Sequence, residues 1–292
     1  MIDLHIHSTF SIDGSGSPEE IMQHAAQKGI RAISLAEHTS IKSLQPAQNA
    51  AKLLGIEYIN GVETAGALEV NGMEAKIHIA AYFFDDNPSG ISQLSDRQER
   101  VRELQADAFL DGLERMDIPL TRMEIENRYP GRYSSWAIRR ILREDGYAKD
   151  KPEVKVLQEQ AIEASSEYHP EYQCEEVLSV EDVLSMLKQD RATTFMAHPF
   201  WLTKASRGGW NENDVWKQIE AMLELGVDGI EAHNTGNDAG YAEIILDFCR
   251  QENIPASGGS DSHGLSLIGE RDISYDLLQS MKNHAAGKAP WT

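Results

Sequence analysis

Two kinds of segment alternate along much of the chain. Short apolar runs at residues 2–7 and 30–35 are typical of buried strands, and amphipathic stretches lie between such runs. The sequence Ser17-Pro18-Glu19-Glu20 has the marks of a helix start, with an N-cap serine, an early proline and a capping-box glutamate. Further strands are predicted up to Glu63 and at 76–82, 193–197, 229–232 and 254–257, with helices at 215–225 and 241–252. Strands that alternate with helices predict a parallel α/β architecture.

The middle third of the chain has a different character. From about residue 88 to 189 it is charged and has helical periodicity, with helices predicted at about 91–116, 121–128 and 134–144. We therefore predict an α/β barrel domain formed by residues 1–87 and 190–292, and a mainly helical insertion formed by residues 88–189. Both junctions lie near candidate site residues, so we expect the insertion to cover the active site.

Polar residues collect where the predicted strands end. They are His5, His7, His38, Glu63, His198, His233 and Asp261. Barrel and open α/β enzymes assemble their sites at the carboxyl ends of their strands. Imidazole and carboxylate groups without thiolates suit Mn²⁺, Fe²⁺ or Zn²⁺. Multi-metal sites of this composition generate a hydroxide at neutral pH and stabilise in-line displacement at phosphorus, so the pattern predicts a metal-dependent hydrolase.

The composition limits the kinds of partner that the protein can be expected to bind. The formal net charge of −20 disfavours a protein that holds long duplex nucleic acid, but it allows local binding of a small phosphorylated ligand. The two cysteines, Cys174 and Cys249, form no CxxC pair and indicate neither a disulfide framework nor a thiolate zinc site. No apolar segment suggests a signal peptide or a membrane span, so we expect a cytoplasmic protein without a membrane partner. The oligomeric state is open.

An ordered set of motifs resembles the PHP (polymerase and histidinol phosphatase) family of metal-dependent phosphoesterases. The set comprises D-L-H-I-H-S at 3–8, S-I-D-G at 11–14, E-H-T at 37–39, G-V-E-T at 61–64, His78, A-H-P at 197–199 and G-S-D-S-H at 259–263. The resemblance covers roughly residues 1–84 and 190–292. It implies a distorted, incomplete (β/α)7 barrel that holds two or three divalent metal ions.

The resemblance also implies which residues bind the metals. One ion would be held by His5, His7, Glu63 and Asp261; a second by Glu63, as a bridge, with His78 and His198; a third by Asp13, His38 and His263. Glu63 and Asp261 are therefore also the candidate catalytic carboxylates. Every expected ligand position is filled. That completeness disfavours the alternative of a metal-binding regulatory module without turnover.

The order of barrel half, helical insertion and barrel half resembles one branch of the family in particular. That branch includes phosphatases that remove the 3′-phosphate from nucleoside 3′,5′-bisphosphates, and a related 5′→3′ exoribonuclease. The implied function is hydrolysis of a phosphate monoester of a small nucleotide by a metal-bridged hydroxide, giving an AMP-type product and phosphate. A 5′→3′ exonuclease acting on short RNA or DNA is the alternative.

Substrate contacts are predicted from basic and polar residues near these motifs. The candidates are Arg132, Ser134 and Arg139 in the insertion, Lys204 and Arg207 in the loop after His198, and His233 as a substrate contact or proton donor. For the basic residues the alternative is a solvated surface position, and for His233 it is a structural role. Trp201 and Trp210 could each cover a base or pack the barrel rim.

Overall fold

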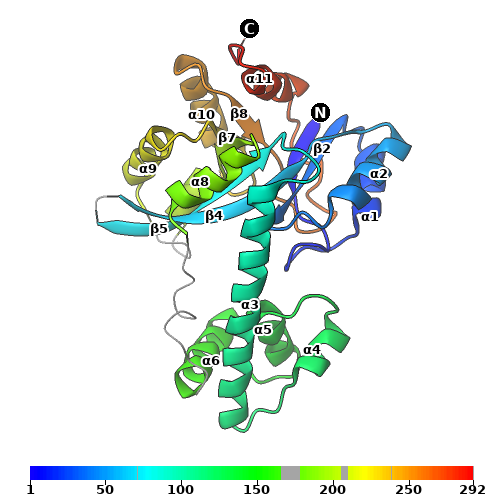
Figure 1. Cartoon of the computed structure of the whole chain (residues 1–292), viewed down its shortest axis with the longest axis vertical. Coiled ribbons are helices and arrows are strands. Elements are labelled where there is room, and N and C mark those ends of the chain that lie inside the picture. Colours follow the sequence, from blue (N-terminus) through cyan, green and yellow to red (C-terminus); the bar gives the residue numbers. More distant parts are fainter. Residues whose placement is uncertain (71, 166–177, 205–209, 238, 292) are drawn as a thin grey trace. The chain divides into compact units, whose positions relative to one another are not determined.

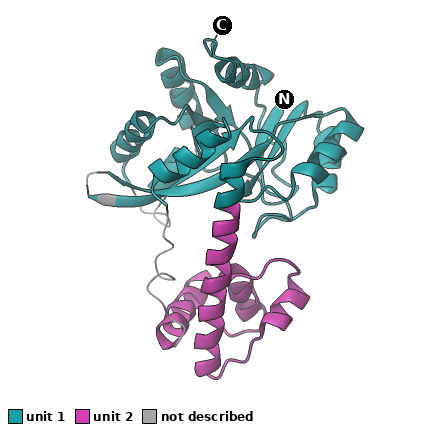
Figure 2. Cartoon of the chain, in the orientation of Figure 1, with its two compact units in different colours: residues 1–94, 177–292 teal, residues 95–176 magenta. Residues whose placement is uncertain are grey.

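The computed structural model describes the chain apart from residues 71, 166–177, 205–209, 238 and 292 (Figure 1). It divides into two compact units (Figure 2). Unit 1 comprises residues 1–94 and 177–292, and unit 2 comprises residues 95–176. In the described part of the chain, no helix combines the length and the apolar character needed to cross a membrane.

Unit 1 is built on one mixed sheet. Its hydrogen-bonded order is β1 (Ile2–Ile6), β2 (Ala32–His38), β4 (Gly61–Val70), β5 (Met73–Tyr82), β6 (Thr193–Met196), β7 (Gly229–His233) and β8 (Ala256–Gly258), while β3 (Glu57–Tyr58) pairs with β2. A parallel bridge between Ile6 and Ser262 joins the first strand to the segment after the last one. Neighbouring strands are parallel except that β5 runs antiparallel to both β4 and β6. The predicted α/β fold class is confirmed.

Helices pack against this sheet on its outer side (Figure 1). They are α1 (Pro18–Gln27), α2 (Leu44–Leu54), α8 (Val180–Gln189), α9 (Glu212–Glu224), α10 (Ala239–Gln251) and α11 (Tyr275–Ala285), with a 3-10 turn η1 (Pro199–Thr203) after β6. The predicted capping box at Ser17 is present, because the Ser17 side chain accepts from Glu20 N and the Glu20 side chain accepts from Ser17 N. Gly55 ends α2 with φ +70°, a conformation that favours glycine. Local sequence signals therefore specify the start of α1 and the end of α2.

Unit 2 has a hydrophobic core of its own. It contains α3 (Ser89–Arg115), α4 (Arg122–Arg128), α5 (Ser135–Glu144) and α6 (Lys151–Ala164), and its core includes Phe109, Leu113, Ile138, Ile141 and Val154. The first turns of α3 instead supply Ile91 and Leu94 to the core of unit 1. The compact unit is thus shorter than the predicted insertion of residues 88–189. Coverage of the active site by the insertion stays a prediction.

Two predicted boundaries need correction. Val180, Val183 and Leu184 of α8 belong to the core of unit 1, so α8 is a barrel helix although it lies within residues 88–189. Glu63 was expected at the end of a strand but is the third residue of the ten-residue β4. The strand continues because β4 pairs with β5 along its whole length, from Gly61↔Tyr82 to Val70↔Met73. Glu63 nevertheless lies beside His38 at the carboxyl end of β2, where the two residues are in register.

Candidate metal centre

Six histidine rings from different strands and loops lie close together at one end of the barrel. The ring centroids of His7 and His38 are 4.1 Å apart, and those of His7 and His263 are 4.3 Å apart. His5 lies on β1 and His7 directly follows its last residue, and their ring centroids are 5.2 Å apart. At the other side of the cluster, His78 and His198 are 5.0 Å apart. The predicted histidines are therefore brought together.

Glu63 lies at the centre of this cluster. Its Oε1 is 2.9 Å from both His78 Nδ1 and His198 Nε2, and its Oε2 is 2.7 Å from His38 Nδ1. His5 Nε2 lies 3.6 Å from Oε1, and His7 Nε2 lies 3.7 Å from Oε2. The side chain is 1 % exposed. A carboxylate with imidazoles around both oxygens has the geometry that a bridging ligand requires.

Two aspartates complete the cluster. Asp261 Oδ1 is 3.2 Å from His7 Nε2 and 3.7 Å from His5 Nε2. Asp13 lies between His38 Nε2 and His263 Nε2, at 3.5 Å from each. All nine candidate ligands thus lie around one continuous site. Potential ligand atoms come within 4.8 Å of one another in three groups, which are His7/His38/His263, His5/His7/Asp261 and His5/Glu63/His198.

The site contains buried polar atoms that lack a hydrogen-bond partner. Within the described residues, His5 Nε2, His7 Nε2 and Asp13 Oδ1 are buried and make no hydrogen bond. Buried polar atoms almost always have a partner, because leaving them unpaired is costly. The ion pairs above place these three atoms facing other candidate ligands. Divalent cations would satisfy all three atoms, so the residues present fit bound metal ions.

The charge states suit the same chemistry. Burial alone would raise the pKa of Glu63, but the His78, His5 and His38 imidazoles together lower it well below its usual range. Burial and the neighbouring His38 lower the pKa of His7 to about 3. Glu63 is therefore an anion and His7 a neutral imidazole, which are the forms that bind metal ions. Burial opposes protonation of His5, but the Glu231 and Glu63 carboxylates raise its pKa well above the usual range, so a metal ion bound there would displace a proton.

Comparison with known proteins agrees with this geometry. The PHP domain family model matches residues 3–171, which is more than half of the chain. The chain belongs to the PHP domain family. The predicted enzyme class, a metal-dependent phosphoesterase, is confirmed with it.

Full-length relatives extend the similarity past residue 171, over His198, Asp261 and His263. The chain is 28% identical over 280 residues to a 5′-3′ exoribonuclease of Haemophilus influenzae, covering 96% of each protein. It is 25% identical over 281 residues to a 3′,5′-nucleoside bisphosphate phosphatase of Chromobacterium violaceum, covering 94% of this chain and 90% of that relative. A solved structure of an amidohydrolase from Chromobacterium violaceum has the same fold, with a TM-score of 0.70 at 22% identity over 94% of this chain and 92% of the other.

A further carboxylate contacts the candidate metal centre, and the sequence pattern did not single it out. Glu231 is buried in β7, and its Oε1 accepts a hydrogen bond of 2.8 Å from His5 Nδ1. The sequence pattern pointed instead to His233, two residues later. The available signal was a charged residue inside the otherwise apolar run Gly229-Ile230-Glu231-Ala232, because an isolated charge is buried only when it is paired.

The predicted substrate-binding residues of unit 1 differ in their surroundings. His233 ends β7 and is half-buried, and burial together with the nearby Arg271 lowers the pKa of its imidazole. Lys204 is exposed after η1, and Arg207 lies outside the described residues. The two tryptophans differ, since the Trp201 ring centroid lies 5.1 Å from that of His198, whereas Trp210 packs against the barrel core.

The basic candidates of the insertion lie in unit 2. Arg139 Nη1 donates to Gln158 Oε1 at 3.0 Å, and burial and the neighbouring Arg143 lower the pKa of Arg139. Within the described residues neither arginine forms an ion pair, and Arg143 Nε is buried without a hydrogen bond. Ser134 is the buried N-cap of α5, and its hydroxyl accepts from Ala137 N. The Arg132 guanidinium lies 5.9 Å from the centre of the Trp136 ring.

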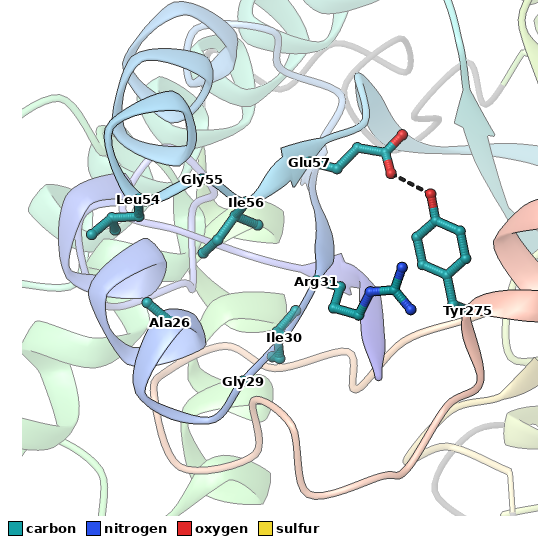
Figure 3. Close-up of a pocket in the computed structure, with 9 residues that line it drawn as sticks. All are labelled: Ala26, Gly29, Ile30, Arg31, Leu54, Gly55, Ile56, Glu57 and Tyr275. Atoms are coloured by element: carbon teal, nitrogen blue, oxygen red, sulfur yellow. Dashed lines mark hydrogen bonds between the residues drawn. The ribbon is translucent and has the colours of Figure 1, made fainter.

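A separate cavity of about 400 Å³ is lined by Arg31, Glu57 and Tyr275 among others (Figure 3). It lies at the opposite end of β2 from the candidate metal centre. Arg31 precedes β2 and His38 closes it, so the two residues are about 20 Å apart along the strand. The Arg31 guanidinium lies 4.3 Å from the centre of the Tyr275 ring, whose hydroxyl donates to Glu57 Oε2. The polar groups that line this cavity contact one another, and the cavity is not part of the metal centre.

Proposed function

We propose that this protein hydrolyses a phosphate monoester of a small nucleotide, with the 3′-phosphate of a nucleoside 3′,5′-bisphosphate as its preferred target. The observation that carries the proposal is the convergence of six histidines and two aspartates on one site around the buried Glu63 carboxylate. Such a set suits two or three divalent ions, of which Mn²⁺, Fe²⁺ and Zn²⁺ match the nitrogen and oxygen donors.

Each group of ligands has a defined part in the proposal. His5, His7, Glu63 and Asp261 would hold one ion, Glu63, His78 and His198 a second, and Asp13, His38 and His263 a third. Bound ions of this kind lower the pKa of water and neutralise the charge that develops on the phosphoryl oxygens. The chain itself keeps Glu63 ionised and several imidazoles buried, so that the donors are held in place before substrate arrives.

Residues outside the ligand set would contact the rest of the substrate. His233, at the end of β7, is the candidate proton donor to the leaving group. Arg132, Ser134 and Arg139 of unit 2, with Lys204 and Arg207 after η1, are the candidate contacts for the phosphate that does not react. The arginine pair Arg139 and Arg143 supports this assignment, because two partly buried cations without a carboxylate partner favour an anionic ligand.

A 5′→3′ exonuclease acting on short RNA is the second candidate. The relative from Haemophilus influenzae named 5′-3′ exoribonuclease favours it. The net charge of −20 argues against long substrates, since polyanions are repelled at long range. A short oligonucleotide would use the same metal centre, with a phosphodiester in place of the monoester.

The two candidates predict different products. The Mn²⁺-loaded protein is incubated with adenosine 3′,5′-bisphosphate, with adenosine 3′-monophosphate and with a 5′-phosphorylated RNA pentamer. Our proposal predicts inorganic phosphate from the bisphosphate at a higher kcat/KM than from the monophosphate, because binding of the remote phosphate assists the reacting one. Efficient release of mononucleotides from the pentamer, with slow cleavage of the bisphosphate, would replace the proposal by the exonuclease assignment.

A further inference from the structure

Glu231 is a buried carboxylate outside the candidate ligand set, yet its contacts reach two of the ligands. The residue is 0 % exposed and lies in the middle of β7. Its Oε1 accepts from His5 Nδ1 at 2.8 Å, and its Oε2 accepts from the backbone N of His198, also at 2.8 Å. One side chain therefore joins a histidine on β1 to a histidine that follows β6.

The contact to His5 determines which ring nitrogen faces the site. Because Nδ1 donates its proton to Glu231, Nε2 is the nitrogen that remains to bind a metal ion. His5 Nε2 is buried, makes no hydrogen bond within the described residues, and lies 3.6 Å from Glu63 Oε1. The carboxylate thus fixes both the proton position and the orientation of the ring.

The contact to His198 acts on the backbone. His198 has φ +30°, in the left-handed region that non-glycine residues rarely adopt. Its N–H is held by Glu231 Oε2, and two residues later Phe200 N donates to Asn237 Oδ1 at 3.2 Å. These bonds hold the turn that directs the His198 ring to Glu63.

The carboxylate is itself fixed by the loop after β7. Asn234 Nδ2 donates to Glu231 Oε2 at 2.9 Å, and Asn234 Oδ1 accepts from Gly236 N at 2.6 Å. A Cβ at Gly236 would lie 2.9 Å from Asn234 Oδ1 and 3.2 Å from His198 Cβ, so the close packing requires glycine there. Glu231 consequently accepts from three donors and has little freedom to turn.

We infer that Glu231 is the positioning residue of the metal centre, setting the His5 ring and the His198 backbone together with one carboxylate. The inference rests on the ligand roles of His5 and His198 in the proposed function. Carboxylates that hydrogen-bond ligating imidazoles fix their orientation and raise their basicity. Here one carboxylate acts on ligands of two predicted ions, so its loss weakens both.

A glutamine cannot replace this carboxylate. All three partners of Glu231 are N–H donors, whereas a glutamine offers one acceptor oxygen and one NH₂ donor. In either orientation the NH₂ group would face a donor. If it faced His5, the ring would have to carry its proton on Nε2, which is the nitrogen needed for the metal.

The chain supplies a matched control next to the same strand. Asp228 lies just before β7 and makes the same kind of contact, with its Oδ1 3.1 Å from His284 Nε2. His284 is on α11 and is not a candidate ligand. Asp228 Oδ2 also accepts from Thr194 N and Thr194 Oγ1 on β6, each at 2.8 Å. The variant Asp228→Asn therefore removes a carboxylate that joins an imidazole to a backbone N–H, at a place where neither partner is a candidate ligand.

The test titrates Mn²⁺ into metal-free full-length protein by isothermal titration calorimetry, using wild type, Glu231→Gln and Asp228→Asn. We expect Glu231→Gln to raise the apparent Kd for Mn²⁺ roughly 10–100-fold, the usual effect of losing such a partner. Asp228→Asn should stay within about threefold of wild type. The visible spectrum of the Co²⁺-loaded protein, which reports ligand geometry, should change in Glu231→Gln and not in Asp228→Asn.

The outcomes separate the inference from the proposed function. A Kd for Glu231→Gln less than about tenfold above that of Asp228→Asn, or a Co²⁺ spectrum identical to wild type, overturns the role of Glu231. If wild type takes up no Mn²⁺, the metal centre itself is contradicted, and the role of Glu231 with it. Circular dichroism of each metal-free variant shows whether it is folded. If Glu231→Gln is not, Asn234→Ala takes its place, and a weakening less than about threefold beyond the control overturns the inference.

Discussion

Removal of the metal ions should destabilise unit 1. All nine candidate ligands belong to this unit, whereas unit 2 has a separate core around Phe109 and Ile138. Without cations, the site retains buried nitrogens of His5 and His7 that lack hydrogen-bond partners within the described residues. A ligand that binds only the folded state stabilises it by mass action, so chelation should lower the unfolding temperature of unit 1.

The size of the effect follows from the linkage relation. At free Mn²⁺ one hundred times above the Kd, each occupied site contributes about 2.7 kcal/mol. Unit 1 has roughly 200 residues, and in domains of that size 1 kcal/mol shifts the Tm by about 2–4 °C. Each bound ion should therefore raise the Tm by about 5–11 °C.

Differential scanning calorimetry with and without Mn²⁺ measures this shift. Glu63→Gln removes the charge of the carboxylate that lies between His38, His78 and His198, so its Mn²⁺-dependent shift should fall below half that of wild type. Asp228→Asn serves as the control and should keep the full shift. An unfolding temperature that does not respond to Mn²⁺ in wild type, or an undiminished response in Glu63→Gln, would refute this reasoning.

Three further predictions concern activity and metal content. Asp261→Asn should keep the circular dichroism spectrum of wild type and abolish phosphate release, since one anionic donor close to His5 and His7 is lost; residual turnover above a few per cent would argue against its role. Arg132→Ala is assayed on adenosine 3′,5′-bisphosphate and on a minimal phosphoester. It should lose roughly 1.5–3 kcal/mol of transition-state stabilisation on the bisphosphate alone. Equal losses on both substrates would show that Arg132 does not belong to the site. Elemental analysis of the purified protein should find about two to three metal ions per chain, and fewer than two would rule out a polynuclear centre.

Much of the barrel could be predicted because its signals are local. The capping box at Ser17, the apolar runs of β1 and β2, and the clustering of polar residues after strands all follow from neighbouring residues. The end of β4 could not be predicted in this way. Its continuation past Glu63 depends on pairing with β5, a tertiary contact that no local pattern specifies.

The same distinction applies to the site. The spacing of His5 and His7 predicts that both side chains point the same way, and their rings do lie close together although β1 ends at Ile6. Glu231 is 226 residues from His5 in the sequence, and only the fold brings its carboxylate to the imidazole. The assignment of α8 depends likewise on packing, because its buried face of Val180, Val183 and Leu187 would fit any apolar partner equally well.

The most direct test of the account is the metal dependence of phosphate release from adenosine 3′,5′-bisphosphate. Protein stripped with a chelator is compared with the same sample reloaded with Mn²⁺, with Asp261→Asn treated identically. The account predicts no release from the stripped protein, full recovery on reloading, and none from Asp261→Asn in either state. Release that continues at the wild-type rate after the metals are removed would contradict it.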